Sequence, residues 1–138
     1  MASAQEYAWI MNPTAIVLFA HGSRDPKWRE PFDAMLHAAQ RIHDGPVMLA
    51  FLEAMHPTFD EAVDALVAHD MRRIRLVPLF LAAGSHIRED LPQLVARACA
   101  RYPDLCIDIL PVLGDDRHMQ TAIVNYALGK EASAYPRA

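Results

Sequence analysis

Two histidines and a glutamate stand just past three separate apolar runs of the chain. They are His21, Glu53 and His86. Neutral imidazole and carboxylate groups are suitable ligands for a divalent transition metal. The same groups accept protons near neutral pH. The sequence therefore predicts metal binding or general-base chemistry, provided that the fold brings these three side chains to one place.

The elements that must position these side chains alternate along the chain. Four apolar runs have the length of buried strands, and four segments repeat apolar residues at three- and four-residue steps, as one face of a helix does. The expected strands are 14–20, 47–52, 73–81 and 105–110, and the expected helices are 27–43, 59–67, 90–101 and 117–128. Strand–helix alternation at this spacing predicts an α/β fold. We expect a flavodoxin-like three-layer sandwich, with a four-stranded parallel sheet in the order 2-1-3-4 and helices on both faces.

In that strand order the switch point lies between the first and third strands, and ligands bind beyond the carboxyl ends of the strands. We therefore expect His21 and His86 to flank the switch point, with Glu53 on the neighbouring strand. His56, close to Glu53, and His118, at the start of the last helix, are left open as further pocket residues.

Two details of the expected elements can be tested by the structure. Pro78 lies inside the third apolar run and has no N–H for a ladder, so either a bulge occurs there or its donor position faces away from a neighbouring strand. The apolar spacing of the last helix predicts an inward face made of Met119, Ala122, Ile123, Tyr126 and Ala127.

Length and composition narrow the class of protein. At 138 residues, with 53% hydrophobic and 22% charged residues, the chain suits one globular domain, which we place at 14–128 between a loose leader (1–13) and a frayed tail (129–138). The net charge of -4 argues against general binding to nucleic acid or to a membrane surface. No apolar run approaches the ~18 residues of a membrane span. Cys99 and Cys106 match no metal or redox spacing, so we expect reduced thiols in a cytoplasmic protein.

Several motifs together resemble one family. The sequence HGSR follows the first strand, FLE ends the second, VPLFLAAGSHIREDLP spans the third strand and the next helix, and PVLGDD follows the fourth. These segments are similar to the class II tetrapyrrole chelatases, and in particular to the short CbiX-like sirohydrochlorin cobaltochelatases. The resemblance extends from about Ala15 to Leu128 and implies a chelatase-like variant of the expected fold.

The resemblance implies insertion of a divalent metal, commonly cobalt, iron or nickel, into sirohydrochlorin for cobalamin or sirohaem-type biosynthesis. No nucleotide is expected, and the absence of a Walker-type phosphate-binding loop from the sequence agrees with this expectation. The metal-binding and catalytic histidines of the family map onto His21 and His86, and its acidic residue maps onto Glu53. Long members hold two similar domains in one chain, so this chain is similar to the short members that form homodimers.

A mechanism follows for such a reaction. His21 and His86 would hold the metal beside the macrocycle, and one of them or Glu53 would accept a pyrrole proton, so activity should fall as the histidines protonate. The substrate's carboxylates would be bound by cations and nearby amides. The residues expected in this role are Gly22, Ser23, Arg24, Gly84, Ser85 and Arg88, and an apolar wall is expected from Phe80, Leu81, Met55 and Leu113.

Two rival functions remain open. A non-catalytic metal or tetrapyrrole carrier could use the same fold, and would bind its ligand without accelerating insertion. A histidine phosphatase would use His21 as its nucleophile, but such enzymes place an arginine immediately before the histidine, where this chain has Ala20.

Overall fold

A computed structural model describes residues 13–130 and shows a four-stranded parallel sheet in the order β2-β1-β3-β4. The strands are β1 (Ala15–Ala20), β2 (Val47–Phe51), β3 (Arg73–Pro78) and β4 (Cys106–Ile109). The α-helices are α2 (Glu30–Ile42), α3 (Phe59–Ala68), α4 (Ser85–Arg101) and α5 (Arg117–Ala127), and the short 3-10 helices are η1 (Pro26–Arg29) and η2 (Leu113–Asp115). The predicted fold class and strand order are confirmed. The predicted domain encloses every one of these elements, whereas most of the expected leader and tail falls outside the described residues.

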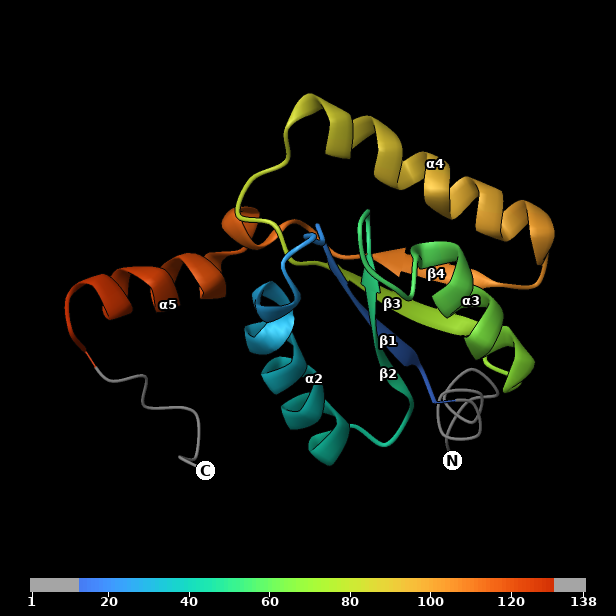
Figure 1. Cartoon of the computed structure of the whole chain (residues 1–138), viewed down its shortest axis with the longest axis horizontal. Coiled ribbons are helices and arrows are strands. Elements are labelled where there is room, and N and C mark those ends of the chain that lie inside the picture. The colour runs from blue at the N-terminus through green and yellow to red at the C-terminus, as the bar shows by residue number, and fades with distance from the viewer. Residues whose placement is uncertain (1–12, 131–138) are drawn as a thin grey trace, which may run out of the picture.

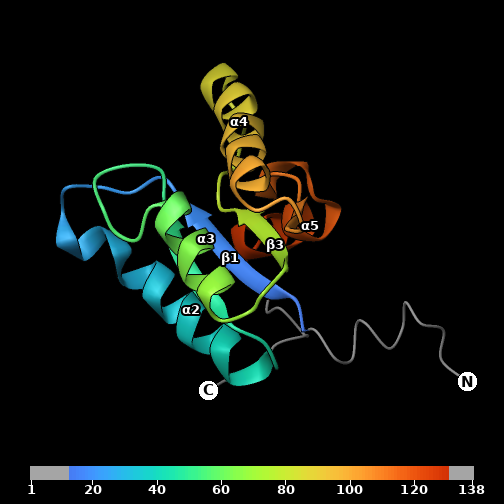
Figure 2. The same cartoon turned by 90° about the vertical axis from the view of Figure 1, so that its right-hand side faces the viewer.

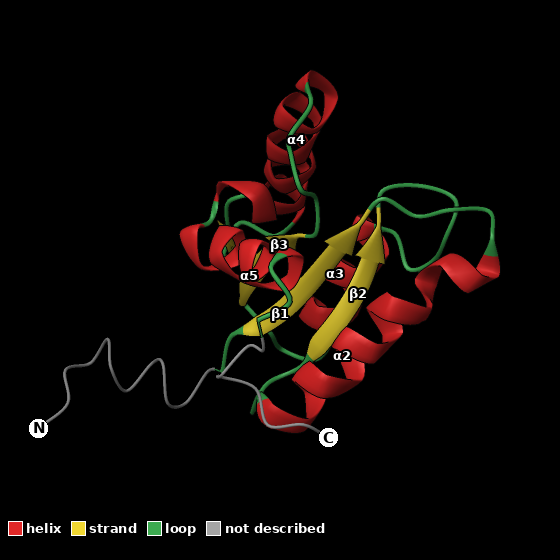
Figure 3. Ribbon diagram, turned by 90° about the vertical axis from the view of Figure 1, so that its left-hand side faces the viewer, coloured by secondary structure: helices red, strands yellow, loops and turns green. Residues whose placement is uncertain are grey.

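Helices lie on both sides of the sheet, as Figures 1 and 2 show. On one side, Val17 and Phe19 of β1 and Leu76 of β3 join a core with α3 and α4. On the other side, Leu49 and Phe51 of β2 pack with half-buried apolar residues of the η1–α2 segment, which are Trp28, Phe32 and Leu36. Figure 3 shows β1 and β2 side by side, with α2 running along them. Because both sides are covered near β1 and β2, these strands are apolar along their whole length.

Local sequence signals explain where several elements begin. Asp25 caps η1 by accepting a hydrogen bond from the Lys27 N–H, and Pro26 suits the first turn because it has no N–H to satisfy. Thr58 and Glu61 form the predicted capping box at the start of α3. Pro78 is the last residue of β3; it is the partner of Phe19 in β1 and lies two positions beyond the final pair of β3 with β4, Leu76 with Ile109. The β1–β3 register reaches Pro78 without a bulge, and the Leu79 N–H donates to Phe19 of β1, so the missing N–H of Pro78 is on the β4 side, beyond the last β3–β4 pair.

The last helix differs from the sequence-based expectation. It occupies the predicted range, but none of its residues is buried, and Ile123 and Tyr126 of the expected inward face are exposed. Figure 1 shows α5 pointing away from the sheet. The prediction of an inward face was therefore wrong for this chain, because the connection from η2 directs α5 away from the sheet. Within residues 13–130, none of the helices combines the length and apolar content needed to cross a membrane.

Candidate functional site

The carboxyl ends of β1 and β2 bring His21 and Glu53 together. Beyond the last strand pair, the Leu52 N–H donates to the Ala20 carbonyl and the Glu53 N–H donates to the His21 carbonyl. This extension of the ladder holds the two side chains side by side, with 2.9 Å between His21 Nε2 and Glu53 Oε1. The side chains are 53% and 64% exposed, so the pair is open to a ligand.

Gly22 allows these two strand ends to approach. Its φ is +93°, in a region that favours glycine, and a Cβ at this position would lie 1.8 Å from the Glu53 carbonyl oxygen. Substrate binding by Gly22 stays a prediction from the sequence. In the structure Gly22 has another role, because only a residue without a side chain lets Glu53 reach His21.

An aromatic ring also lies near the histidine. The ring of Phe80, which follows β3, stands edge-on to the His21 imidazole with the ring centroids 6.5 Å apart. Phe80 also packs against buried Phe19, with centroids 6.0 Å apart. Hydrogen bonding from the Leu79 N–H to the Phe19 carbonyl extends the β1–β3 ladder up to this point. The His21 side chain thus contacts both a carboxylate that follows β2 and an aromatic ring anchored in the core.

The histidine of the loop between β2 and α3 forms a hydrogen bond with a residue of α3. His56 Nδ1 lies 2.7 Å from Glu61 Oε1, and the same carboxylate oxygen accepts the Thr58 N–H at 3.3 Å. The hydrogen bond from His56, followed by that from the Thr58 backbone, lowers the pKa of Glu61 below its ordinary value of 4.5. His56 therefore supports the start of α3. His118, also left open by the sequence, lies 3.8 Å from Asp116 Oδ1 with its side chain 97% exposed.

His86 belongs to a helix and not to a strand end. It is the second residue of α4, which begins at Ser85, five residues earlier than the sequence predicted, after Gly84 as N-cap. Gly84, Ser85 and His86 are all exposed. In the part of the chain that the structure describes, no three histidine, cysteine, aspartate or glutamate side chains are grouped closely enough to hold one metal ion. The His21–Glu53 contact is present, whereas the role of His86 stays a prediction.

The candidate cations have different surroundings. Arg24 and Arg88 are exposed, and Arg88 borders an apolar hollow between the start of α4 and the segment after β4. Ser23 accepts a hydrogen bond from the Asp25 N–H through its hydroxyl oxygen, at 3.1 Å. Arg29 is used internally, because it pairs with Asp33 at 3.1 Å and lies over the Phe51 ring. Arg24 and Arg88 are therefore two exposed cations of this edge that could meet a substrate carboxylate.

Two features of this region were not predicted from the sequence. The hollow beside Arg88 is lined by apolar side chains of α4 and of the segment around β4, including Ile87, Leu91 and Ile109. Only the tertiary structure brings these residues together, although each carries the apolar spacing of its own element.

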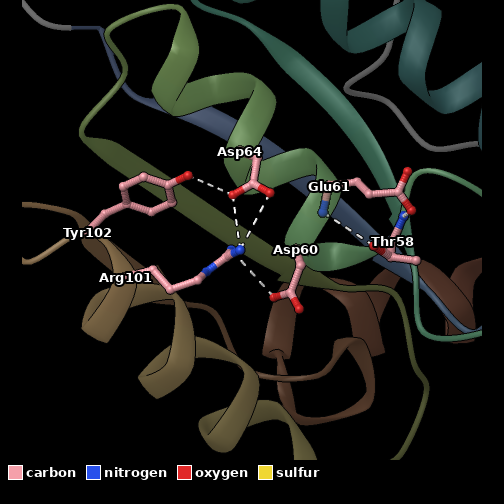
Figure 4. A network of polar contacts seen from close by, with 6 residues as sticks. All are labelled: Thr58, Asp60, Glu61, Asp64, Arg101 and Tyr102. Carbon is pink, nitrogen blue, oxygen red and sulfur yellow. Dashed lines mark hydrogen bonds and ion pairs between the residues drawn. The ribbon is translucent and has the colours of Figure 1, made fainter.

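The second unpredicted feature is a polar network that joins α3 to α4, shown in Figure 4. Arg101 lies 3.1 Å from Asp64 and 3.7 Å from Asp60, and the Tyr102 hydroxyl donates to Asp64 at 2.7 Å. This hydrogen bond, followed by burial, raises the pKa of Tyr102 above its ordinary value of 10.0. The network fastens the helix that carries His86 to the helix that follows the Glu53 loop.

The geometry of the His21–Glu53 pair suits metal binding. Two donor atoms that are each about 2.1 Å from one ion, at right angles, are about 3.0 Å apart. The observed 2.9 Å between Nε2 and Oε1 is therefore close to the separation of two neighbouring ligands. Without an ion, the imidazole N–H donates to the carboxylate, so an incoming ion would displace that proton.

Comparisons with known proteins identify relatives of this chain. The CbiX family model matches residues 15–128. A sirohydrochlorin ferrochelatase of Bacillus subtilis is 31% identical over 110 residues, which cover 79% of this chain and 42% of that protein. A sirohydrochlorin cobaltochelatase of Methanothermobacter thermautotrophicus is 31% identical over 80 residues, which cover 58% of this chain and 56% of that protein.

A solved structure of similar length shares the fold. It is a putative cobalamin biosynthesis CbiX protein from Marinobacter aquaeolei, with a TM-score of 0.76 and 29% identity over 85% of this chain and 96% of that one. By contrast, the chain spans about half the length of the curated relatives it matches. The family match covers nearly all of the described residues, and the chain therefore belongs to the CbiX family of class II chelatases.

Proposed function

We propose that this protein inserts a divalent metal ion into sirohydrochlorin without ATP, in cobalamin or sirohaem-type biosynthesis. The observation that carries the proposal is the exposed pair of His21 and Glu53, 2.9 Å apart beside the Phe80 ring. The names of the relatives support sirohydrochlorin as the substrate, and they name both iron and cobalt. We propose cobalt as the metal. Iron and nickel are alternatives, because imidazole and carboxylate ligands accept all three ions.

In the proposed reaction the metal ion is a substrate. His21 and Glu53 bind it at the strand ends, and the ion takes the place of the proton they share. As the ion moves into the macrocycle, the pair is released and its free carboxylate or imidazole can accept a pyrrole proton. The site thus binds a cation in one state and a proton in the other. We propose His86, from the start of α4, as a further metal ligand and proton acceptor.

The macrocycle would lie against the edge formed by Phe80 and the apolar hollow beside Arg88. Leu81, which is 66% exposed, offers further apolar surface there. Arg24 and Arg88 would pair with carboxylates of the substrate, and the exposed N–H groups at the start of α4, from Gly84 and Ser85 onward, could donate hydrogen bonds to others.

A second copy of the chain would complete the cleft. The B. subtilis relative is long enough to hold a second unit of this size, since this chain covers 42% of it. We therefore propose a homodimer in which the second copy provides the wall facing the His21–Glu53 pair. Both cysteines within residues 13–130 are free thiols, which is consistent with a reducing compartment, and we place the protein in the cytoplasm.

The test is insertion of Co²⁺ into sirohydrochlorin, followed by absorption, with Fe²⁺ and Ni²⁺ in parallel. His21→Ala and Glu53→Gln should each lower the rate by at least about tenfold, as losses at metal sites typically do. His37→Ala, at an exposed position on α2, is the matched control and should insert at the normal rate. Normal rates for both site variants would refute the assignment.

Calorimetry with Co²⁺ alone separates the chelatase from the carrier. The chelatase should bind the ion, release a proton and accelerate insertion over the spontaneous reaction. Tight binding of one ion with no acceleration would favour the carrier instead.

A further inference from the structure

Four aromatic rings form a continuous row from the core to the candidate site. Phe59 of α3 packs edge-on against Phe19 of β1, with the ring centroids 6.0 Å apart and the planes at 75°. Phe19 packs in the same manner against Phe80, at 6.0 Å and 77°. Phe80 stands edge-on to His21, at 6.5 Å and 88°. Perpendicular aromatic pairs attract each other at such separations, so the His21 imidazole is the outermost ring of a row that begins in the core.

The inner end of this row is fixed by burial. Phe19 is 0% exposed and Phe59 is 2% exposed, and both belong to the core that the sheet shares with α3 and α4. Phe80 is half-buried and packs against the same core. Side chains in a close-packed core rest in favoured rotamers and interdigitate with few voids. The two buried rings therefore give the Phe80 ring a firm support.

The backbone that carries Phe80 is held from two sides. The Leu79 N–H, just before it, donates to the Phe19 carbonyl of β1 at 2.8 Å. The Leu113 N–H of η2 donates to the Phe80 carbonyl, also at 2.8 Å. A Cβ on Gly114 of η2 would collide with the carbonyl oxygen of the residue that follows Phe80, so η2 packs directly on this segment. Contacts with β1 and with η2 thus fix the place of the Phe80 ring.

The imidazole of His21 has few other contacts. Its Nε2 lies 2.9 Å from Glu53 Oε1, and its side chain is 53% exposed. Within residues 13–130, no hydrogen bond is formed with its Nδ1. A histidine that binds a metal ion usually donates its second ring N–H to a carboxylate or a carbonyl, and this bond fixes the direction of the ring. Because the described part of the chain supplies no such acceptor, the Phe80 ring is the contact that can take over this task.

Metal binding would make the contact with Phe80 more important. When an ion takes the place of the proton that His21 and Glu53 share, the hydrogen bond between them is lost. The contact between the two rings involves no proton and can persist. We propose that Phe80 is a positioning residue, whose ring holds the His21 imidazole in the direction at which Nε2 and the Glu53 carboxylate bind one ion. This role rests on the metal binding proposed above, and it goes beyond the apolar wall that Phe80 offers to the macrocycle.

Ring motion in the metal-free protein tests the positioning directly. Relaxation of ¹³C nuclei in the imidazole measures how firmly His21 is held, and the His21 signal is identified by its loss in His21→Ala. Glu53→Ala removes the hydrogen bond, and the imidazole should stay rigid because the Phe80 ring still supports it. Adding Phe80→Leu, which keeps an apolar side chain without a ring, should make the imidazole mobile. Equal mobility with and without the Phe80 ring would overturn the proposal.

Calorimetry with Co²⁺ tests whether this support matters for the metal ion. With Glu53 in place, Phe80→Leu should bind Co²⁺ about tenfold more weakly than the wild type, as is typical when a group that orients a metal-binding histidine is lost. Phe32→Leu on α2 is the matched control, because Phe32 is also a half-buried ring in an aromatic pair, with Trp28 at 4.5 Å, on the other side of the sheet. The control should bind Co²⁺ normally. Normal affinity in Phe80→Leu would overturn the proposal.

The two measurements also separate this proposal from the proposed function. Neither of them measures insertion, so a protein that bound Co²⁺ but inserted no metal would contradict the proposed function alone. A wild type that bound no Co²⁺ would also contradict the proposed function, and the relaxation measurement would still decide whether Phe80 holds His21.

Discussion

Replacing Gly22 by alanine tests how the strand ends form the site. The new methyl group would meet the Glu53 carbonyl oxygen at 1.8 Å, and the obstacle is backbone that belongs to the continued β1–β2 ladder. Neither a rotamer change nor a flexible neighbour can relieve this contact. The end of β1 and the Glu53 segment must therefore move apart.

The expected cost has two parts. Holding an alanine in a left-handed conformation costs about 1–2 kcal/mol. Displacing the two backbone segments brings the total to about 2–4 kcal/mol, in the range of other strained backbone positions. At about 4 °C per kcal/mol for a domain of this size, the melting temperature should fall by about 8–16 °C. Because the His21–Glu53 contact depends on this approach, affinity for Co²⁺ should also fall, by about tenfold or more.

Thermal unfolding and calorimetry with Co²⁺ measure the two effects on one preparation. Gly84→Ala is the matched control for stability, because its φ is negative and nothing lies within 4 Å of an added Cβ. At position 84, alanine is a slightly worse N-cap residue than glycine, but it also lowers the conformational entropy of the unfolded chain. These two effects on stability offset each other, so the melting temperature should hardly change. If Gly22→Ala melted like the wild type and bound Co²⁺ normally, the account of the site given above would be refuted.

Two further predictions concern the contacts around α3. Arg101→Ala should lower the free energy of unfolding by about 1 kcal/mol or less, because its pairs with Asp60 and Asp64 are partly exposed, and the loss should shrink in high salt; an equal loss in 1 M NaCl would contradict an ionic origin. The pKa of Glu61 is lowered in the folded state, so its contribution to stability is present above pH 4.5 and is lost as the pH falls through the lower, folded-state pKa. His56→Ala removes the largest cause, so its urea midpoint should fall less steeply on the acid side than that of the wild type; superimposable profiles would argue against this coupling.

The sequence was sufficient wherever a structural choice depends on neighbouring residues along the chain. The apolar runs predicted all four strands, because strands buried on both faces need continuous apolar side chains. Thr58 and Glu61 predicted the start of α3 correctly, since a capping box is closed within one turn. The alternation of strands and helices was enough to predict the sheet order, because connection rules leave few arrangements.

Helix ends and partners were predicted less well where the signal was weak or distant. The start of α4 was placed too late, because Gly84 caps it without a side-chain hydrogen bond and leaves only a faint pattern. The apolar spacing of α5 correctly predicted a helix but not what covers it. That spacing is the same whether the partner surface belongs to the same chain or to another.

For the site, the sequence by itself placed His21, Glu53 and His86 at the carboxyl edge of a parallel sheet, because each follows an apolar run. The tertiary structure decided which of them meet. The Gly22 backbone and the extended β1–β2 ladder put Glu53 2.9 Å from His21, and the Phe80 ring stands edge-on to the imidazole. His86 begins a helix whose position is fixed by packing and by the Arg101–Asp64 contact rather than by strand pairing. A strand end is determined by local pattern, whereas the distance between two side chains depends on contacts between residues far apart in the chain.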